Sequence, residues 1–550
     1  MVAYHPLPGS RRELLPHSRL AGPVDVAELA SLTIRVRPGR AAPMDLVKLA
    51  YDLAQQPLSE RKYLTRAELE QQHGASKNDL DRVEHYVQQH NLMVTYRSAV
   101  ERSIVVRGKL GDLLNAFHAD VQMFHSARGT YRGRTGEIGV PNDLQDIVTG
   151  VFGYDTRPKH RSPSRRKRWM ASGPGGSNGV AATEFAKRYG FPTTHNGGKA
   201  LDGSGQTIAI LELGGGFRQS DLQAYFHEIG VPSPQVISVA VDRAGNQPTT
   251  SDSADGEVML DIEVAGAVAP GAKIAVYFAP NTGDKGFLDA LSAMVHDAQR
   301  DPSVISISWG SPEATTDQQG LDAYHQVFAA AAVLGITICV AAGDHGTADM
   351  DAASWDGQIH VDHPACDDLV LSCGGTQVEN GTDVVWNDGT SFNKATGEGG
   401  WAGGGGISTL FQVPSYQQGA QIPASLVSGK GGRGVPDIAM SATNYFVRVD
   451  SYEGASGSTS AVAPLMAALV VLLNQATDHK VGFLNPFLYA NAAQGIVHGV
   501  TSGTNAIAGT VKGYDAGAGW NACTGLGTPD GAAILQALQA PATGQAKAVA

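Results

Sequence analysis

Long apolar runs alternate with amphipathic segments from about residue 200 onward. The runs lie at residues 206–215, 273–280, 302–310 and 336–344, and segments with helical spacing lie at 220–230, 286–298 and 320–335. Strands that are apolar on both faces, with helices between them, predict a parallel α/β sheet. In such sheets functional residues gather beyond the carboxyl ends of the strands. Three residues of chemical interest occupy such ends: Glu212, Trp309 and Asp344.

The chain before this region has a different pattern. Residues from about 30 to 155 suggest a small α+β unit, with strands at 32–40, 92–108 and 121–127 and helices at 44–56, 76–90 and 109–120. This order predicts an antiparallel sheet with helices on one face. The segment that follows, residues 157–179, is basic, contains proline and glycine, and has no periodicity. We therefore expect it to be an exposed linker.

Charge is divided unevenly between the two regions. Residues 1–170 carry 26 Lys and Arg against 18 Asp and Glu, a net charge of +8, and the rest carries 15 against 35, a net charge of −20. Opposite charges predict that the two regions dock, and that docking weakens as carboxylates are protonated at low pH. The alternative is a chance asymmetry between unrelated domains. The acidic region would repel phosphates, so nucleic acid is not an expected partner.

Length and composition add further bounds. A chain of 550 residues predicts two or more domains. No run approaches the roughly 20 apolar residues of a membrane span, and the N-terminus has no apolar region typical of a secretory signal. The cysteines are too few for a disulfide framework and form no CxxC pair. Free buried thiols are expected, with a Cys366–Cys373 bridge as the alternative; the four are Cys339, Cys366, Cys373 and Cys523.

Ser460 is a candidate nucleophile, because the stretch GSTSAVAPL places it where a small-residue loop meets a long apolar segment. A serine hydroxyl needs a base to take its proton. His345, in GDHGTAD, would give a neutral subtilisin-type protease. Glu257 and Asp261 lie four residues apart in a helix-competent segment, so they project from one face. Two adjacent carboxyls cannot both ionise cheaply and can hold a proton between them. An ordinary exposed helix face is the alternative for this pair.

The chain resembles the sedolisin family of serine-carboxyl peptidases from about residue 178 to residue 540. The resemblance rests on DGEVMLDIEVAGAVAPGAKIAVYFAPN, SVISISWG, CVAAGD, RGVPDIA, GSTSAVAPLMAALV and GWNACTGLGTPDG, which follow one another in the family's order. It implies an α/β fold, namely a subtilisin-like parallel sheet with flanking helices, preceded by an α+β antiparallel prodomain. It also implies that a glutamate replaces the histidine base.

The resemblance implies a role for each matching residue. Ser460 is the nucleophile, Glu257 is its general base and acid, and Asp261 is the carboxyl coupled to Glu257. Asp344 matches the aspartate at the oxyanion hole, and the carboxyl network is extended by Glu212 and Trp309. An aspartate donates a hydrogen bond only while it is protonated, so activity at acidic pH is expected.

The implied organisation is that of a zymogen. Residues 1–156 are the expected propeptide, residues 157–179 the activation linker, and residues 180–550 the peptidase domain. The expected enzyme is an acid-active endopeptidase that removes its own propeptide. Its partners are polypeptide substrates and the propeptide as intramolecular inhibitor, without nucleic acid or membrane. A monomer is expected, and secretion follows from the family alone.

Two departures from the family bear on activity and cofactors. Ser458 stands where glycine is usual, and its side chain would crowd the nucleophile if the glycine served a positive φ. A catalytically impaired homologue is therefore an alternative. The family's calcium site lacks both of its aspartates here, so no tight calcium site and no other cofactor are expected. Its matching positions are Gly499, Val500, Gly517, Gly519 and Asn521.

Two further positions are candidates for the substrate cleft. The glycine-dense stretch 397–416, which includes Gly404 and Gly405, matches a segment that the family uses beside its cleft. The alternative for most of its length is a mobile surface loop. Asp362, in HVDHPA, is predicted to line a subsite that favours basic side chains.

Overall fold

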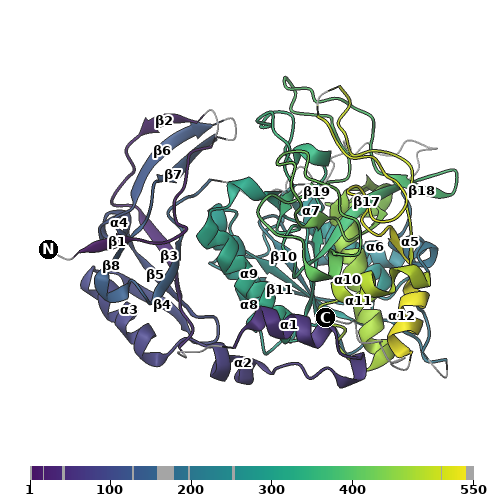
Figure 1. Cartoon of the computed structure of the whole chain (residues 1–550), viewed down its shortest axis with the longest axis horizontal. Coiled ribbons are helices and arrows are strands. Elements are labelled where there is room, and N and C mark those ends of the chain that lie inside the picture. Colours follow the sequence, from purple (N-terminus) through teal and green to yellow (C-terminus); the bar gives the residue numbers. More distant parts are fainter. Residues whose placement is uncertain are drawn as a thin grey trace.

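The computed structural model describes residues 3–15, 18–39, 44–126, 129–157, 179–195, 198–250, 254–509 and 511–540. Nearly all of the predicted linker, residues 157–179, therefore lies outside the described residues. The part after the linker is built on an eight-stranded sheet in the order β11-β12-β10-β13-β15-β17-β18, with β21 also paired to β17 (Figure 1). All neighbours run parallel except β17 and β18.

Four of the eight strands in this sheet match the predicted apolar runs, and the other four extend the sheet on both sides of them. The eight strands are β10 (Thr207–Glu212), β11 (Gln235–Ala240), β12 (Lys273–Phe278), β13 (Val304–Ile307), β15 (Thr337–Ala341), β17 (Leu371–Glu379), β18 (Thr382–Val385) and β21 (Ile438–Ser441). The strands of this part that lie outside the main sheet are β14 (Ser311–Pro312), β16 (Asp362–His363), β19 (Gly406–Ile407), β20 (Gly434–Val435), β22 (Tyr445–Val449), β23 (Tyr452–Ser456), β24 (Val497–His498) and β25 (Thr528–Pro529).

Helices cover both faces of the sheet, which confirms the predicted subtilisin-like α/β architecture. Ile208 and Ile210 of β10 belong to one hydrophobic core, and Ala209 and Leu211, between them, belong to another. The first core contains α7 (Asp255–Val268) and α10 (Thr459–Thr477), and the second contains α8 (Gly283–His296) and α9 (Gln318–Val333). The remaining helices are α5 (Ala182–Arg188), α6 (Gln219–Glu228), α11 (Asn485–Asn491) and α12 (Gly531–Gln539).

The N-terminal part forms the predicted antiparallel unit with its own core. Its main sheet has the order β4-β5-β3-β9, and a second sheet has the order β2-β6-β7. The elements are β1 (Tyr4–Pro6), β2 (Arg19–Gly22), β3 (Leu29–Val36), α1 (Leu46–Ala54), α2 (Arg66–His73), α3 (Lys77–Gln89), β4 (Met93–Ser98), β5 (Ser103–Lys109), α4 (Leu110–Phe117), β6 (Asp120–Ser126), β7 (Gly129–Thr135), β8 (Gly139–Pro141) and β9 (Val148–Phe152).

The prediction that this sheet carries its helices on one face is wrong for α1, and α2 was not predicted from the sequence. Only α3 and α4 pack on the sheet, whereas α1 packs on α9 and α11 of the C-terminal part. Leu46, Ala50 and Leu69 lie in the core that contains α8 and α9. The apolar spacing of α1 is real, but it matches a surface of the other domain. In Figure 1, α1 and α2 run along the lower side of the larger domain.

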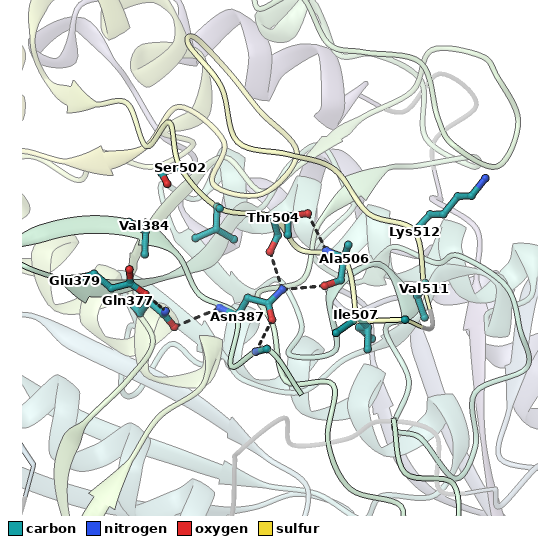
Figure 2. A pocket seen from close by; sticks show the side chains of 15 residues that line it. Gln377, Glu379, Val384, Asn387, Ser502, Thr504, Ala506, Ile507, Val511 and Lys512 are labelled. Carbon is teal, nitrogen blue, oxygen red and sulfur yellow. Dashed lines mark hydrogen bonds between the residues drawn. The ribbon is translucent and has the colours of Figure 1, made fainter. Parts of the chain in front are cut away.

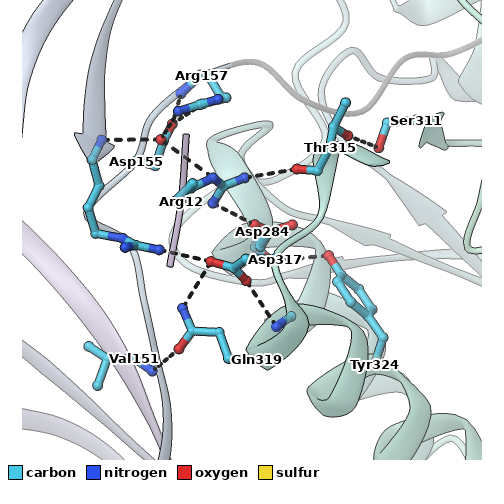
Figure 3. A network of polar contacts seen from close by, with 12 residues as sticks. Arg12, Val151, Asp155, Arg157, Asp284, Ser311, Thr315, Asp317, Gln319 and Tyr324 are labelled. Carbon is cyan, nitrogen blue, oxygen red and sulfur yellow. Dashed lines mark hydrogen bonds and ion pairs between the residues drawn. The ribbon is translucent and has the colours of Figure 1, made fainter. Parts of the chain in front are cut away.

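Buried ion pairs join the two parts, as their opposite charges predict (Figure 3). The guanidinium of Arg12 lies 2.9 Å from Asp284, and that of Arg134 lies 2.8 Å from Asp317. Asp155, at the end of the N-terminal part, binds Arg157 at 2.6 Å. The pairs are almost fully buried, so complementary charge is built into the docked interface.

By its length and composition, helix α10 could cross a membrane, but 94% of its most apolar 18-residue segment is buried inside the protein. It is therefore the core helix of the larger domain, and its run of apolar residues reflects that burial. All four cysteines are buried and free, so the alternative bridge between Cys366 and Cys373 does not form.

Candidate active site

Residues at the carboxyl ends of three parallel strands meet a pair of carboxyls on α7. Glu212 ends β10, and Trp309 and Asp344 closely follow β13 and β15. Glu257 and Asp261 lie on α7, which is buried along nearly its whole length. The alternative of an exposed helix face is thus wrong, because no side of α7 at these positions reaches solvent.

The carboxyls form one buried, electrostatically linked cluster. Burial, followed by the charge of Glu257, raises the pKa of Asp261 well above its ordinary value. Burial and the charges of Asp261 and Glu257 do the same to the pKa of Glu212. The indole Nε1–H of Trp309 donates to Glu212 Oε2 at 3.0 Å. The cluster therefore holds protons at neutral pH, because several adjacent charges cannot be buried together.

Asp344 is oriented by the helix that carries the serine. The backbone N–H and the hydroxyl of Thr459 donate to its Oδ1 at 2.8 and 2.7 Å. Its Oδ2 is buried and has no hydrogen-bond partner among the described residues. Burial raises the pKa of Asp344 well above its ordinary value, although the Thr459 bonds lower it. The arrangement leaves Oδ2 as the oxygen that carries the proton and has a hydrogen bond to offer.

Ser460 lies in the first turn of α10 and is fully buried. Its hydroxyl has no hydrogen-bond partner within the part of the chain that the structure describes. Ser458 is the N-cap of the helix, and its hydroxyl accepts the backbone N–H of Ser460 at 3.0 Å. Its φ is −178°, which is extended backbone. The condition for crowding, a positive φ at this position, is therefore not met, and serine fits here without backbone strain.

Ser308 was missed in the sequence. Its hydroxyl lies 2.7 Å from Asp261 Oδ2 and 3.3 Å from the carbonyl oxygen of Ser460. A hydroxyl has one proton, so it donates to Asp261 when that carboxyl is ionised. When Asp261 is protonated, the carboxyl donates to Ser308, which then donates to the Ser460 carbonyl. The signal available was its position beside Trp309, at the end of the same strand.

A cavity of about 180 Å³ opens beside Asp344. Asp362 lines it, and burial raises the pKa of Asp362 to about 8. His345 also lines it, with its ring packed edge-on against Trp401 at a centroid distance of 4.6 Å. The other lining residues are Ser308, Gly310, Ser311, Pro312, Ala341, Gly343, Asp349, Met350 and Asp351.

Gly404 and Gly405 are not in this lining. Both are buried in a close approach of backbone segments. A Cβ on Gly404 would lie 2.0 Å from the Ala342 carbonyl oxygen, and one on Gly405 would lie 2.2 Å from that of Ala522. Packing therefore gives both positions a need for glycine that is separate from substrate binding.

One group of side chains has a spacing compatible with a metal ion among the described residues: His325, Asp367 and Asp368. Although burial lowers it, the charge of Asp367 raises the pKa of His325 to about 9. The ring is thus protonated at neutral pH and forms an ion pair at 2.9 Å. Tyr51 of α1 donates to Asp368. The group is an ion-pair network that reaches across the interface to α1.

Comparisons with known proteins agree with this architecture. Residues 16–157 match the family described as Pro-kumamolisin, activation domain, and residues 243–506 match the Subtilase family. The chain is 41% identical to kumamolisin from Bacillus sp. (strain MN-32), over 98% of this chain and 97% of that protein. It is 27% identical to sedolisin from Pseudomonas sp. (strain 101), over 77% of this chain and 72% of that protein.

A solved structure extends the agreement to three dimensions. It is that of Pseudomonas sedolisin, titled a serine-carboxyl proteinase complexed with pseudo-iodotyrostatin. It superposes with a TM-score of 0.55 at 28% identity, over 66% of this chain and 98% of that one. The resemblance inferred from sequence blocks is confirmed by full-length identity and by fold. The chain belongs to the sedolisin family of serine-carboxyl peptidases, together with kumamolisin, and carries that family's activation domain.

Proposed function

We propose that the chain is an acid-active serine endopeptidase in which Ser460 is the nucleophile and Glu257 its base. The observation that carries the proposal is the buried Ser460 hydroxyl, which lies in the same region as several buried carboxyls, at the carboxyl ends of the parallel strands. Two of these carboxyls, Asp261 and Asp344, have raised pKa values. Such a cluster keeps some carboxyls neutral as donors and leaves another to accept a proton.

Cleavage proceeds through an acyl-serine. Ser460 Oγ attacks the carbonyl carbon while its proton passes to Glu257, and the carbonyl oxygen becomes an oxyanion. Collapse of this intermediate breaks the C–N bond as Glu257 returns the proton to the leaving nitrogen. Water then attacks the acyl group with the same proton transfers, which releases the carboxylic acid and restores the serine.

Asp344 supplies the oxyanion donor in this scheme. Its Oδ1 is already occupied by Thr459, so Oδ2–H is the group offered to the oxyanion. The reaction needs Asp344 protonated while Glu257 is ionised. Activity should therefore fall as the pH rises through the raised pKa of Asp344. Asp261, with Glu212 and Trp309 behind it, positions Glu257 and tunes its proton affinity.

Ser458→Gly is expected to raise kcat by about tenfold with KM unchanged. In the structure the Ser458 hydroxyl accepts the N–H of Ser460, a donor that serine peptidases direct at the oxyanion. Because the hydroxyl can rotate away, the gain should stay below the 10²–10³ of a full oxyanion donor. Steady-state kinetics on a fluorogenic peptide tests this. A lower kcat would mean that the hydroxyl assists the reaction.

Asp362 is proposed to favour a basic side chain in the cavity beside Asp344. It is buried and lines that cavity, and a cationic group would stabilise its ionised form. His345, on the same cavity wall, is held by its contact with Trp401 and is not given the role of base.

The N-terminal domain is proposed to inhibit the enzyme by holding the segment next to this cavity. Ser311 and Pro312 line the cavity, and the guanidinium of Arg12 donates to the Thr315 carbonyl three residues further on. The backbone N–H of Gln319 donates to the Gly9 carbonyl. We assign residues 1–156 to the propeptide and place the activation cut within residues 157–179. Figure 3 shows the contact of Arg12 with Thr315 beside the ion pair of Arg12 with Asp284.

Acid release of this domain is proposed to depend on histidines as well as on carboxylates, because the interface carboxylates differ in sign. Burial opposes the shift, but the hydrogen bond from Arg66 of α2 helps to lower the pKa of Asp301, so protonation there favours release. Burial raises the pKa of Asp317, so the docked state holds its proton more tightly and acid does not favour release there. Protonation of Asp317 by itself is therefore not the step that weakens docking. Burial, followed by the charge of Arg102, lowers the pKa of His73 to about 4. His73 is buried on α2 next to Gln326 of α9, and the charge of Asp45 acts against the lowering of its pKa.

The lowered pKa of His73 means that acid favours release of the N-terminal domain. Above its ordinary pKa of 6.5 the ring is neutral in both states. Undocking removes the cover of α9 from the ring, so between that value and about 4 the undocked state binds a proton more readily and docking weakens as the pH falls. His296, on the peptidase side near Arg35 and Glu101, also has a pKa lowered by burial.

An acidic extracellular or lumenal medium is the proposed setting of the protein.

The proposal predicts that purified zymogen cuts its own linker when acidified, and that Ser460→Ala abolishes the cut. Electrophoresis and mass analysis of the products over a pH series provide the measurement. His73→Gln, which cannot become charged, should shift the midpoint of processing to lower pH. His85→Gln is the matched control, because His85 is exposed on α3 of the same domain. A zymogen that stays intact at acidic pH while active enzyme cuts it would contradict self-processing.

A further inference from the structure

The residues at the family's calcium positions do not fit a calcium ion. Calcium takes six to eight oxygen ligands, preferably charged ones. Gly499 offers no side chain, and the only polar side chain among the matching positions is the Asn521 carboxamide. The backbone carbonyls of Val500 and Gly517 do face the site, but a nitrogen already lies against them. Asn521 Nδ2 donates to Val500 O at 3.1 Å and to Gly517 O at 3.4 Å.

The orientation of the Asn521 amide is fixed by its other side. Its Oδ1 accepts the backbone N–H groups of Cys523 and Thr524 at 3.1 and 3.0 Å, and the Thr524 hydroxyl at 3.1 Å. Backbone N–H groups only donate, so the atom facing them must be the oxygen. The NH₂ group therefore faces the two carbonyls. Asn521 is 6% exposed, so these bonds are formed away from water.

We propose that the Asn521 carboxamide replaces the calcium ion that the family resemblance implies, and that folding of this domain needs no metal. A cation at this site would bind carbonyl oxygens of the 499–500 and 517–521 segments and hold the two together. The NH₂ group of Asn521 does the same with two hydrogen bonds, while its oxygen closes the following turn. The device uses neutral groups throughout, which matches the loss of both carboxylates.

Other asparagine amides tie neighbouring loops in the same way. Asn387 Nδ2 donates to the carbonyls of Thr504 and Ala506 at 2.8 and 2.9 Å. Figure 2 shows this amide between the 502–512 loop and the segment after β18, on the wall of a cavity of about 640 Å³. Asn505 Oδ1 accepts the Tyr514 N–H at 2.8 Å, and its Nδ2 contacts the carbonyls of Gly405 and Ala522. The C-terminal loops are thus held by amide bridges at three places.

The first test needs only one change, Ser460→Ala, which prevents self-digestion of the full chain. We expect the same Tm in calcium and in a chelator, and no stoichiometric calcium after dialysis. A Tm that falls in the chelator, or one calcium retained per chain, would overturn the proposal. This comparison does not depend on whether any variant at the site folds.

The second test converts the site. Asn521→Asp in the Ser460→Ala background removes both donors and sets a carboxylate against two carbonyl oxygens, so the Tm in chelator should fall by about 5 °C or more. Adding Gly499→Asp should make the Tm rise with calcium, because two carboxylates and the freed carbonyls then form a hard oxygen site. Gly499 lacks a positive φ, and a Cβ there would meet no heavy atom within 4 Å.

The control is Asn521→Ala, which loses the same bridge without creating a ligand. Its Tm should fall equally with and without calcium. The proposal is overturned if Asn521→Ala and Asn521→Asp both keep the parent Tm in chelator, since the amide would then hold nothing together. It is also overturned if calcium raises the Tm of the parent as much as that of the double variant.

Discussion

Glu257→Gln is expected to reduce peptide hydrolysis by roughly 10⁴–10⁶-fold, the range found when a member of a nucleophile–base unit is removed. Glutamine has nearly the shape of glutamate but cannot take the Ser460 proton. Ser460→Ala should lose as much, and the double variant should lose no more, because the two residues act as one unit. Cleavage of the zymogen's own linker at acidic pH and turnover of a fluorogenic peptide are the two readouts.

Two controls make this result specific. Glu263→Gln alters another buried glutamate on α7, one that accepts the backbone N–H of Arg448 and lies outside the proposed site. It should keep activity within about tenfold, since the substitution touches no reacting group. His345→Ala should likewise retain acid-dependent cleavage. Loss of activity in His345→Ala, together with a functional Glu257→Gln, would return the role of base to the histidine.

Asp344 provides the second large effect, through a pair of substitutions. Asp344→Ala is expected to lower kcat by about 10²–10³-fold, the value of one oxyanion donor. Asp344→Asn should retain much more activity at acidic pH. The Asn Oδ1 can still accept both Thr459 donors, and its NH₂ group then replaces the Oδ2–H that Asp344 offers only when protonated.

The pH dependence of these variants shows whether Asp344 acts in its protonated form. Wild-type activity should fall as the pH rises through the raised pKa of Asp344, because the donor loses its proton. In Asp344→Asn the fall in activity should move to higher pH, where the remaining carboxyls determine it. Profiles of kcat against pH for the three proteins measure it. Equal loss in Asp344→Asn and Asp344→Ala, with no change in the pH of that fall, would show that the residue does not act as a proton-dependent donor.

Much of the fold and of the candidate site could be predicted because local pattern and burial agree there. The apolar neighbours of Glu257 and Asp261 indicated a helix without a solvent face, and α7 is such a helix. The strand ends likewise located Glu212, Trp309 and Asp344. By contrast, the apolar face of α1 was assigned to the wrong sheet. Spacing shows that a face is buried, but it does not show which domain covers it.

The misses share a physical cause, since each depends on hydrogen bonds between distant segments. Ser308 bridges Asp261, 47 residues before it, and the Ser460 carbonyl, 152 residues after it. Ser458 was identified only as a departure from the usual glycine, and the sequence did not show that its extended backbone lets the hydroxyl cap α10. The role of Asn521 as a bridge depends on carbonyls that no motif records. In each case the residue type was visible and its partner was not.

The most direct test of the central claim is the pH profile of peptide hydrolysis by wild type and Glu257→Gln from about pH 3 to about pH 8. The carboxyl mechanism predicts activity confined to acidic pH in the wild type, and its loss at every pH in Glu257→Gln. Activity at neutral pH that survives Glu257→Gln would contradict it, because the Ser460 proton would then have another acceptor.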